Sequence, residues 1–129
     1  MGNILSTLRR LLKKRHHKRF VVQSGTFVIV SPGTDQEQKV QLVDISQGGM
    51  AFIYQGSPEE LEESGILKVL VDRAYLSKVE YDTASDLPCP GCAESSVPYR
   101  RRGVKFRWMG VMQEVELKHY IKKVRINTE

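Results

Sequence analysis

Two short motifs in this sequence carry side chains whose types and spacing suit recognition of an anionic, hydrogen-bonding ligand. The first motif, RHHKR, places Arg15 and Arg19 four residues apart, with Lys14 directly before it. Arginine donates paired hydrogen bonds that fit phosphate and also the N7 and O6 acceptors of guanine. Lysine keeps the positive charge but lacks the planar fork. The motif therefore predicts a cationic anchor for a phosphate or a guanine base.

The second motif, DISQGG, brings a carboxylate and a hydroxyl together at the end of a predicted strand. Alternate side chains of a strand share one face, so Val43 and Ile45 are expected in the core. Asp44 and Ser46 then point outward, side by side. A carboxylate there accepts hydrogen bonds from the donor edge of guanine, which complements the arginines of the first motif.

Two glycines close this second motif. Gly48 and Gly49 permit a bulge or a positive φ, and they remove side chains that would keep a flat ligand from the backbone. An ordinary hairpin turn explains the same residues, with Asp44 or Ser46 bonding to the local backbone. Both interpretations stay open at this point.

The combination of the two motifs resembles the PilZ family of cyclic di-GMP receptors. The order and separation of the motifs agree with that family, and RRGVKF and LKHYI are similar to its final strand and closing helix. The resemblance covers residues 15–124. The matching positions are RxxxR in RHHKR and DxSxxG in DISQGG, that is Arg15, Arg19, Asp44, Ser46 and Gly49.

The resemblance implies a barrel whose N-terminal arm wraps a cyclic dinucleotide against the outer wall. Arg15 and Arg19 would hold guanine edges and phosphates, Asp44 and Ser46 would hold base and backbone, and the glycines would allow close approach. Many family members look to carry arginine where this chain has Lys14. One or two ligands per chain are therefore both possible.

The pattern of the whole chain predicts an all-β fold, an antiparallel barrel or sandwich closed by a C-terminal α-helix. The resemblance implies that it is a six-stranded antiparallel PilZ-type β-barrel. The expected strands are rich in β-branched and aromatic residues and lie at 25–32, 39–46, 50–56, 66–72, 75–82 and 99–108. Residues 57–65 predict one helical turn, capped by Ser57 and ended by Gly65. Residues 86–98 are expected to form a loop.

The last predicted element is a helix over 112–124. Its apolar spacing predicts that Val115, Tyr120, Ile121 and Val124 face the barrel. Phe106 and Trp108 alternate with Arg107, so both are expected in the core. Arg100, Arg101 and Arg102 are expected at a solvated strand edge, where one of them could extend the anion site.

The charge of the 129-residue chain is concentrated at its N-terminus. The net charge is +5, yet seven arginines and lysines lie within the first nineteen residues and no acidic residue precedes Asp35. We divide the chain into a basic amphipathic segment, 1–14, and a barrel domain, 15–126. The apolar residues of 4–12 recur at helical spacing and predict packing on this domain or on a sister subunit. Peripheral membrane contact is the alternative.

Cys89 and Cys92 form a CxxC pair in a Pro-Gly loop. Such a pair can bind zinc or close a disulfide, but no second CxxC exists, and structural zinc sites need four ligands. We expect reduced, inert thiols, no metal site and a cytoplasmic location. The sequence leaves a monomer and a homodimer equally open.

No arrangement of catalytic residues is visible, so the sequence predicts a non-enzymatic receptor with cyclic di-GMP as ligand and no cofactor. Binding is expected to order the basic arm and thereby signal to a protein partner. Two alternatives remain: a basic barrel that binds nucleic acid, or an adaptor acting through protein or membrane contacts. The sequence offers no exposed aromatic residues for base stacking, so no specific nucleic acid is expected.

Overall fold

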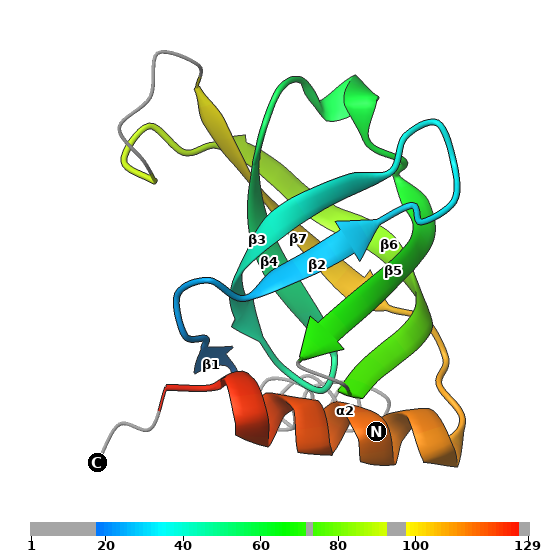
Figure 1. Ribbon diagram of the computed structural model, residues 1–129. Coiled ribbons are helices and arrows are strands. Elements are labelled where there is room, and N and C mark those ends of the chain that lie inside the picture. The colour runs from blue at the N-terminus through cyan, green and yellow to red at the C-terminus, as the bar shows by residue number, and fades with distance from the viewer. Residues whose placement is uncertain (1–17, 72–73, 93–97, 127–129) are drawn as a thin grey trace, which may run out of the picture.

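The computed structural model describes residues 18–71, 74–92 and 98–126 (Figure 1). Seven strands, one 3-10 helix and one α-helix follow in chain order. They are β1 (Phe20–Val21), β2 (Phe27–Val30), β3 (Gln38–Ile45), β4 (Gly49–Gln55), η1 (Pro58–Glu60), β5 (Ser64–Val71), β6 (Ala74–Pro88), β7 (Tyr99–Phe106) and α2 (Val111–Val124).

Six of the strands close into an antiparallel barrel, which confirms the predicted fold class. The order is β3-β2-β5-β6-β7-β4, and β4 pairs with β3 to complete the circle. The short strand β1 pairs with the last residues of β3, beyond the part of β3 that pairs with β2, and Val21 lies opposite Asp44. Closure leaves the barrel strands without free edges.

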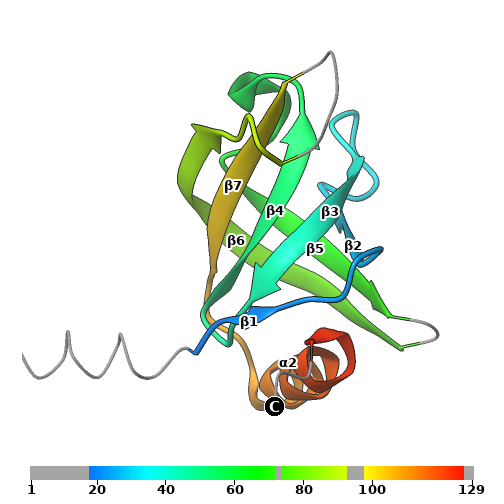
Figure 2. The same cartoon turned by 90° about the vertical axis from the view of Figure 1, so that its left-hand side faces the viewer.

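Helix α2 lies across one end of the barrel, while η1 lies at the other end (Figures 1 and 2). Four buried side chains of α2 join the barrel core: Leu117, Tyr120, Ile121 and Val124. The chain around β1 is tied to the end of α2, because the Ile126 amide donates to the Val21 carbonyl at 2.8 Å. The N-terminal strand and the C-terminal helix therefore meet at the same end of the barrel.

A β-bulge in β3 changes the predicted inward and outward pattern. The register with β4 shifts between Leu42 and Asp44, and an extra residue at this point reverses the alternation. Leu42 and Ile45 are consequently both in the core, although they are three residues apart. The expectation that Val43 is a core residue is wrong, because Val43 is only half-buried.

Two predicted boundaries also differ. Strand β6 continues to Pro88, because its pairing with β7 extends through Leu87 and Pro88 into the segment expected to be a loop. The turn after β4 ends at Glu60, and Ser57 makes no side-chain cap. Gly65 does not end a helix but lies in β5, opposite Tyr81.

Two side chains near the C-terminus were predicted to lie in the core but are exposed. Trp108 is 88% exposed, because β7 ends at Phe106 and strand alternation stops there. Val115 is 45% exposed, because α2 packs on the face of Leu117 and Tyr120, and residues two apart on a helix lie about 200° apart. Phe106 packs partly buried against the core.

No helix within the described ranges is both long and apolar enough to cross a membrane.

Candidate functional site

The carboxylate of Asp44 lies between two guanidinium groups. The Nη2 atom of Arg101 donates to Asp44 Oδ2 at 2.6 Å, and Arg19 Nη1 lies 3.8 Å from Oδ1. The side chain of Asp44 is 12% exposed, whereas those of Arg101 and Arg19 are 44% and 72% exposed. The pairing of β1 with β3 brings Arg19 to this place, which joins one residue from each sequence motif.

The hydroxyl of Ser46 organises the turn between β3 and β4. Its Oγ accepts hydrogen bonds from the amides of Gly48 at 3.1 Å and Gly49 at 3.2 Å, and Oγ lies 3.3 Å from the Gly49 carbonyl. The local-backbone interpretation therefore holds for Ser46. Asp44, in contrast, makes ion pairs across the barrel surface.

Both glycines of the turn contact β7, and Gly49 must be a glycine for this contact. A Cβ atom on Gly49 would lie 2.1 Å from the carbonyl oxygen of Val104, so only glycine lets β4 approach β7 this closely. The carbonyl of Gly48 accepts a hydrogen bond from the Phe106 amide at 2.9 Å. The described glycines with positive φ lie elsewhere, at Gly25, Gly33 and Gly56.

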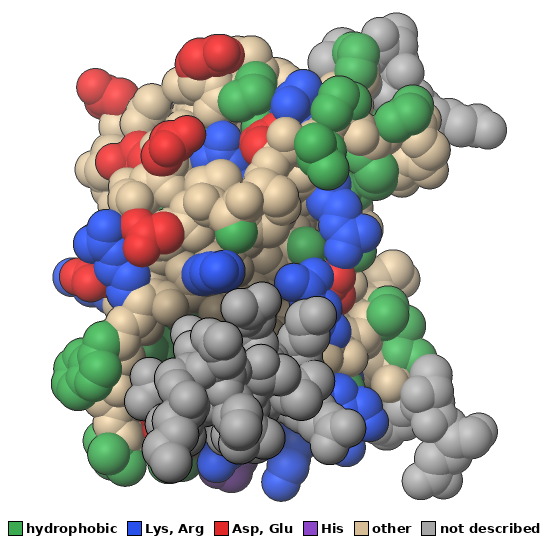
Figure 3. All heavy atoms as spheres, turned by 180° about the vertical axis from the view of Figure 1, so that it is seen from behind, with side chains coloured by type: hydrophobic (Ala, Val, Ile, Leu, Met, Phe, Trp, Pro, Cys, Tyr) green, Lys and Arg blue, Asp and Glu red, His purple; other side chains and the backbone are tan. Residues whose placement is uncertain are grey.

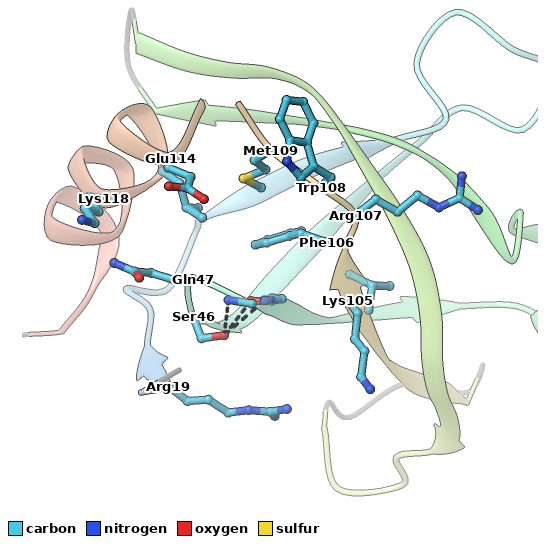
Figure 4. Close-up of a pocket in the computed structure, with 14 residues that line it drawn as sticks. Arg19, Ser46, Gln47, Lys105, Phe106, Arg107, Trp108, Met109, Glu114 and Lys118 are labelled. Atoms are coloured by element: carbon cyan, nitrogen blue, oxygen red, sulfur yellow. Dashed lines mark hydrogen bonds between the residues drawn. The ribbon is translucent and has the colours of Figure 1, made fainter. Parts of the chain in front are cut away.

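A pocket of about 1010 Å³ opens between this turn, the end of β7 and the start of α2 (Figure 4). Arg19 stands at one margin, and the ring of Phe106 lies between the Ser46 turn and Met109. The volume is at the upper end for small-molecule sites. Asp44 does not line this pocket, but it is joined to the pocket margin through Arg19.

The pocket lies at the basic end of the molecule. Its lining includes four cations and one carboxylate, namely Arg19, Lys105, Arg107, Lys118 and Glu114. Arg107 is neutralised by Asp82, whose Oδ1 is 2.8 Å from Nη2. Figure 3 shows lysines and arginines over the middle and lower part of one face, with acidic side chains mostly over its upper part. Such a field favours an anionic ligand.

The three consecutive arginines of β7 divide between the two faces of the strand. Arg101 faces outward and pairs with Asp44. The sequence predicted that one arginine of the run could extend the anion site, without indicating which. Arg102 is 1% exposed, so the expectation of a solvated edge is wrong for this residue. Strand alternation indicates this burial, because Arg102 lies two residues before the core residue Val104 and therefore on the same face of β7.

Arg102 is buried because its hydrogen bonds are satisfied there. It donates to the Asp86 carboxylate at 2.8 Å and to the carbonyls of Pro58 and Glu62, each at 3.0 Å. Arg100 Nε donates to the other oxygen of Asp86 at 2.5 Å, and the Tyr54 hydroxyl also bonds to this carboxylate.

This second cluster perturbs two pKa values. Burial raises the pKa of Asp86, but hydrogen bonds from Tyr54, Arg102 and Arg100 outweigh that effect and leave it below its ordinary value. Burial, together with the hydrogen bond to Asp86, raises the pKa of Tyr54 to about 12. Protein donors bond to both oxygens of this carboxylate, so the cluster is a closed scaffold.

Several predictions fall outside the described residues or need correction. Lys14, Arg15 and the apolar residues of 4–12 lie outside the described ranges. Cys89 and Cys92 are joined by a disulfide, not reduced as expected, because the Pro-Gly turn brings their Cα atoms to 5.5 Å. In the described part of the chain, no group of three acidic, cysteine or histidine residues could hold a metal.

The expectation that no aromatic side chain is exposed for base stacking is also wrong, because the exposed side chain of Trp108 lines the pocket.

Comparison with solved structures places this fold among known barrels. The chain is similar to the PilZ domain of YcgR from Escherichia coli, solved with c-di-GMP, with a TM-score of 0.66 and 16% identity over 86% of this chain and 91% of that one. It is similar to MrkH from K. pneumonia in complex with c-di-GMP, with a TM-score of 0.65 and 11% identity, covering 84% and 51%.

The PlzA protein of Borreliella burgdorferi, also in complex with c-di-GMP, is a third similar structure. Its TM-score is 0.60 and its identity 12%, with 92% of this chain and 55% of PlzA covered. The chain thus spans about half the length of MrkH and PlzA.

No curated protein sequence matches this chain. A sequence model of the PilZ domain, however, matches residues 13–123, which is most of the chain. The match includes the barrel, the Asp44 site and α2. On this ground the chain belongs to the PilZ domain family.

Proposed function

We propose that this chain is a non-enzymatic receptor for cyclic di-GMP. The observation that carries the proposal is the pairing of Arg19 with Asp44, at 3.8 Å, beside a basic pocket. Residues far apart in sequence thereby present a guanidinium and a carboxylate at one place. The three similar structures described above, each solved with c-di-GMP, support this choice of ligand.

The two charged groups have complementary roles on a guanine base. Arg19, which is largely exposed, can turn its fork toward N7 and O6 or toward a phosphate. Asp44 accepts hydrogen bonds from the donor edge of the base. Arg101 holds the carboxylate at 2.6 Å and thus keeps it oriented while Arg19 exchanges partners.

The pocket offers partners for the rest of the nucleotide. Lys105 and Lys118 supply positive charge for the phosphates, and the Phe106 ring gives a flat apolar surface for a base. Ser46 and Gly48 contribute by holding the turn that forms one wall. A volume of about 1010 Å³ is ample for one compact cyclic dinucleotide.

The proposal extends to the segment before the barrel. Lys14 and Arg15 would join Arg19 on the ligand, because clustered cations repel one another until an anion lies among them. Ligand binding would then order this arm and change what a protein partner meets. A reaction and a cofactor are not part of the proposal, and a cytoplasmic location stays a prediction.

Calorimetric titration of the full chain with cyclic di-GMP tests the proposal. We expect saturable binding, with Arg19→Ala and Asp44→Ala each weakening affinity at least about tenfold, as expected for loss of a charge-assisted hydrogen bond. The matched controls are Lys39→Ala and Asp35→Ala, which remove the same charges from exposed positions away from the pocket. Unchanged affinity in both site variants would sink the proposal.

The same variants separate a receptor from a nucleic-acid-binding barrel. The affinity for a single-stranded oligonucleotide falls steeply with salt concentration and depends on lysine and arginine side chains, so it survives Asp44→Ala. Binding to cyclic di-GMP needs the carboxylate. Oligonucleotide binding with no cyclic di-GMP binding would select the alternative.

A further inference from the structure

An exposed apolar patch lies at the start of α2. Its four side chains are 88%, 77%, 73% and 45% exposed, and we call them the helix patch: Trp108, Val111, Met112 and Val115. The later half of the helix packs against the barrel, so these residues face away from the core. Contiguous exposed apolar side chains mark interaction surfaces in soluble domains.

The helix patch adjoins the pocket and so lies near the place where the described chain begins. Trp108 and Met109 form part of the pocket lining, and Arg19 lies at the margin of the same pocket (Figure 4). The chain preceding Arg19 therefore starts across this pocket from the patch. Residues 13–18 can span at most roughly 20 Å when extended, so the segment before them stays close to this pocket.

The sequence of residues 4–12 has the chemistry that the helix patch needs. Its apolar positions lie on one side of a predicted helix and are Ile4, Leu5, Leu8, Leu11 and Leu12. Basic residues occupy the opposite side. Exposed Glu114 and Glu116 lie beside the apolar residues of the helix patch, and these carboxylates can pair with basic residues of the segment.

We propose that the apolar side of residues 4–12 packs on the helix patch of the same chain. Packing in cis follows from the short connection through residues 13–18, which gives the segment a high effective concentration at the patch. The interaction does not require a nucleotide, so it stands or falls independently of the proposed ligand.

The fluorescence of Trp108 measures this packing directly, because it is the only tryptophan in the chain. The full chain is compared with Leu8→Asp, which places a charge in the apolar stripe, and with Ser6→Asp, which places the same charge on the opposite side. We expect the wild type and Ser6→Asp to share a blue-shifted emission and low quenching by acrylamide. Leu8→Asp should shift the emission to the red and raise the quenching constant.

Each other outcome overturns the inference in a recognisable way. Equal, strong quenching in all three proteins means that the patch is not covered by the segment. Shielding that disappears on dilution means that a second copy covers it. Shielding that appears only with vesicles containing anionic phospholipid means that a lipid surface does. Circular dichroism verifies that all variants keep the barrel.

Discussion

Two carboxylates of this barrel are held by arginines from the same stretch of β7, yet their surroundings are opposite. Asp86 is bonded by Arg100, Arg102 and Tyr54, with the Arg102 side chain only 2% exposed. Asp44 is paired with Arg101 and Arg19, which are 44% and 72% exposed. One cluster is closed inside the protein, and the other opens toward solvent beside the pocket.

The difference follows from strand alternation and decides what each cluster can do. Consecutive residues of β7 face opposite sides, so neighbouring arginines enter different environments. On the inner face, each nitrogen of the Arg102 guanidinium donates to a protein acceptor, and removing Asp86 leaves an uncompensated buried charge. On the outer face, the Asp44 carboxylate is as buried as Asp86, but its arginine partners are partly exposed, so their remaining donors are available to a ligand. The same residue type therefore serves the scaffold on one face and recognition on the other.

The largest effect is expected from breaking the closed cluster. Asp86→Ala leaves the buried charge of Arg102 without its partner and should lower the free energy of unfolding by about 3–5 kcal/mol. Urea denaturation of this variant and of Asp35→Ala, an exposed control, measures the effect. If Asp86→Ala were no more destabilising than Asp44→Ala, the contrast between the two clusters would be refuted.

The open cluster should show the reverse behaviour. Asp44→Ala is expected to lower the free energy of unfolding by only about 1 kcal/mol, because its arginine partners are partly exposed and neither is left as a buried charge. Its affinity for cyclic di-GMP should fall by the equivalent of about 1.5–3 kcal/mol, the value of a charge-assisted hydrogen bond. Parallel denaturation and calorimetry measure both quantities. A large loss of stability without a loss of affinity would make Asp44 a structural residue.

The turn beside Asp44 sharpens the comparison, because its stability comes from backbone packing. Gly49→Ala pushes a methyl group against the Val104 carbonyl and should cost about 1–3 kcal/mol, the usual range for overpacking. Gly91→Ala is the matched control, since a Cβ atom there meets no atom within 4 Å. Equal denaturation midpoints for the two variants would show that the close approach of β4 and β7 is not required.

The smallest effect concerns acid. Because the pKa of Asp86 is lower in the folded protein than its unfolded value of about 3.9, its contribution to stability is present above that pH. The contribution is lost as pH falls further, through the folded pKa. Urea unfolding at a series of pH values should therefore show a shallower acid decline for Asp86→Asn than for the wild type. Identical slopes would contradict the assignment.

Sequence patterns predicted most of the scaffold and the part of the site that depends on local spacing. The six barrel strands and α2 followed from composition and periodicity, and Asp44 and Ser46 were expected at one turn. The structure brings Arg19 to 3.8 Å from Asp44, and the binding of a ligand by these two residues stays a prediction. Lys14 and Arg15 lie outside the described residues, so their role stays a prediction.

The misses arise where a distant partner or an irregularity decides the outcome. The β3 bulge depends on pairing with β4 and moved Val43 out of the core. Arg102 is buried because Asp86 reaches it from β6, in a stretch expected to be a loop. Trp108 is exposed because the strand stops two residues earlier. Strand alternation with Val104 indicates the inward position of Arg102, but the β3 bulge and the end of β7 at Phe106 have no signal in the local sequence.

A crystal structure of the full chain with cyclic di-GMP would show whether Arg19 and Asp44 bind the nucleotide. We expect a guanine held between the Arg19 guanidinium and the Asp44 carboxylate, with phosphates toward Lys105 and Lys118. A nucleotide bound elsewhere, with Arg19 and Asp44 still paired only to protein groups, would contradict it.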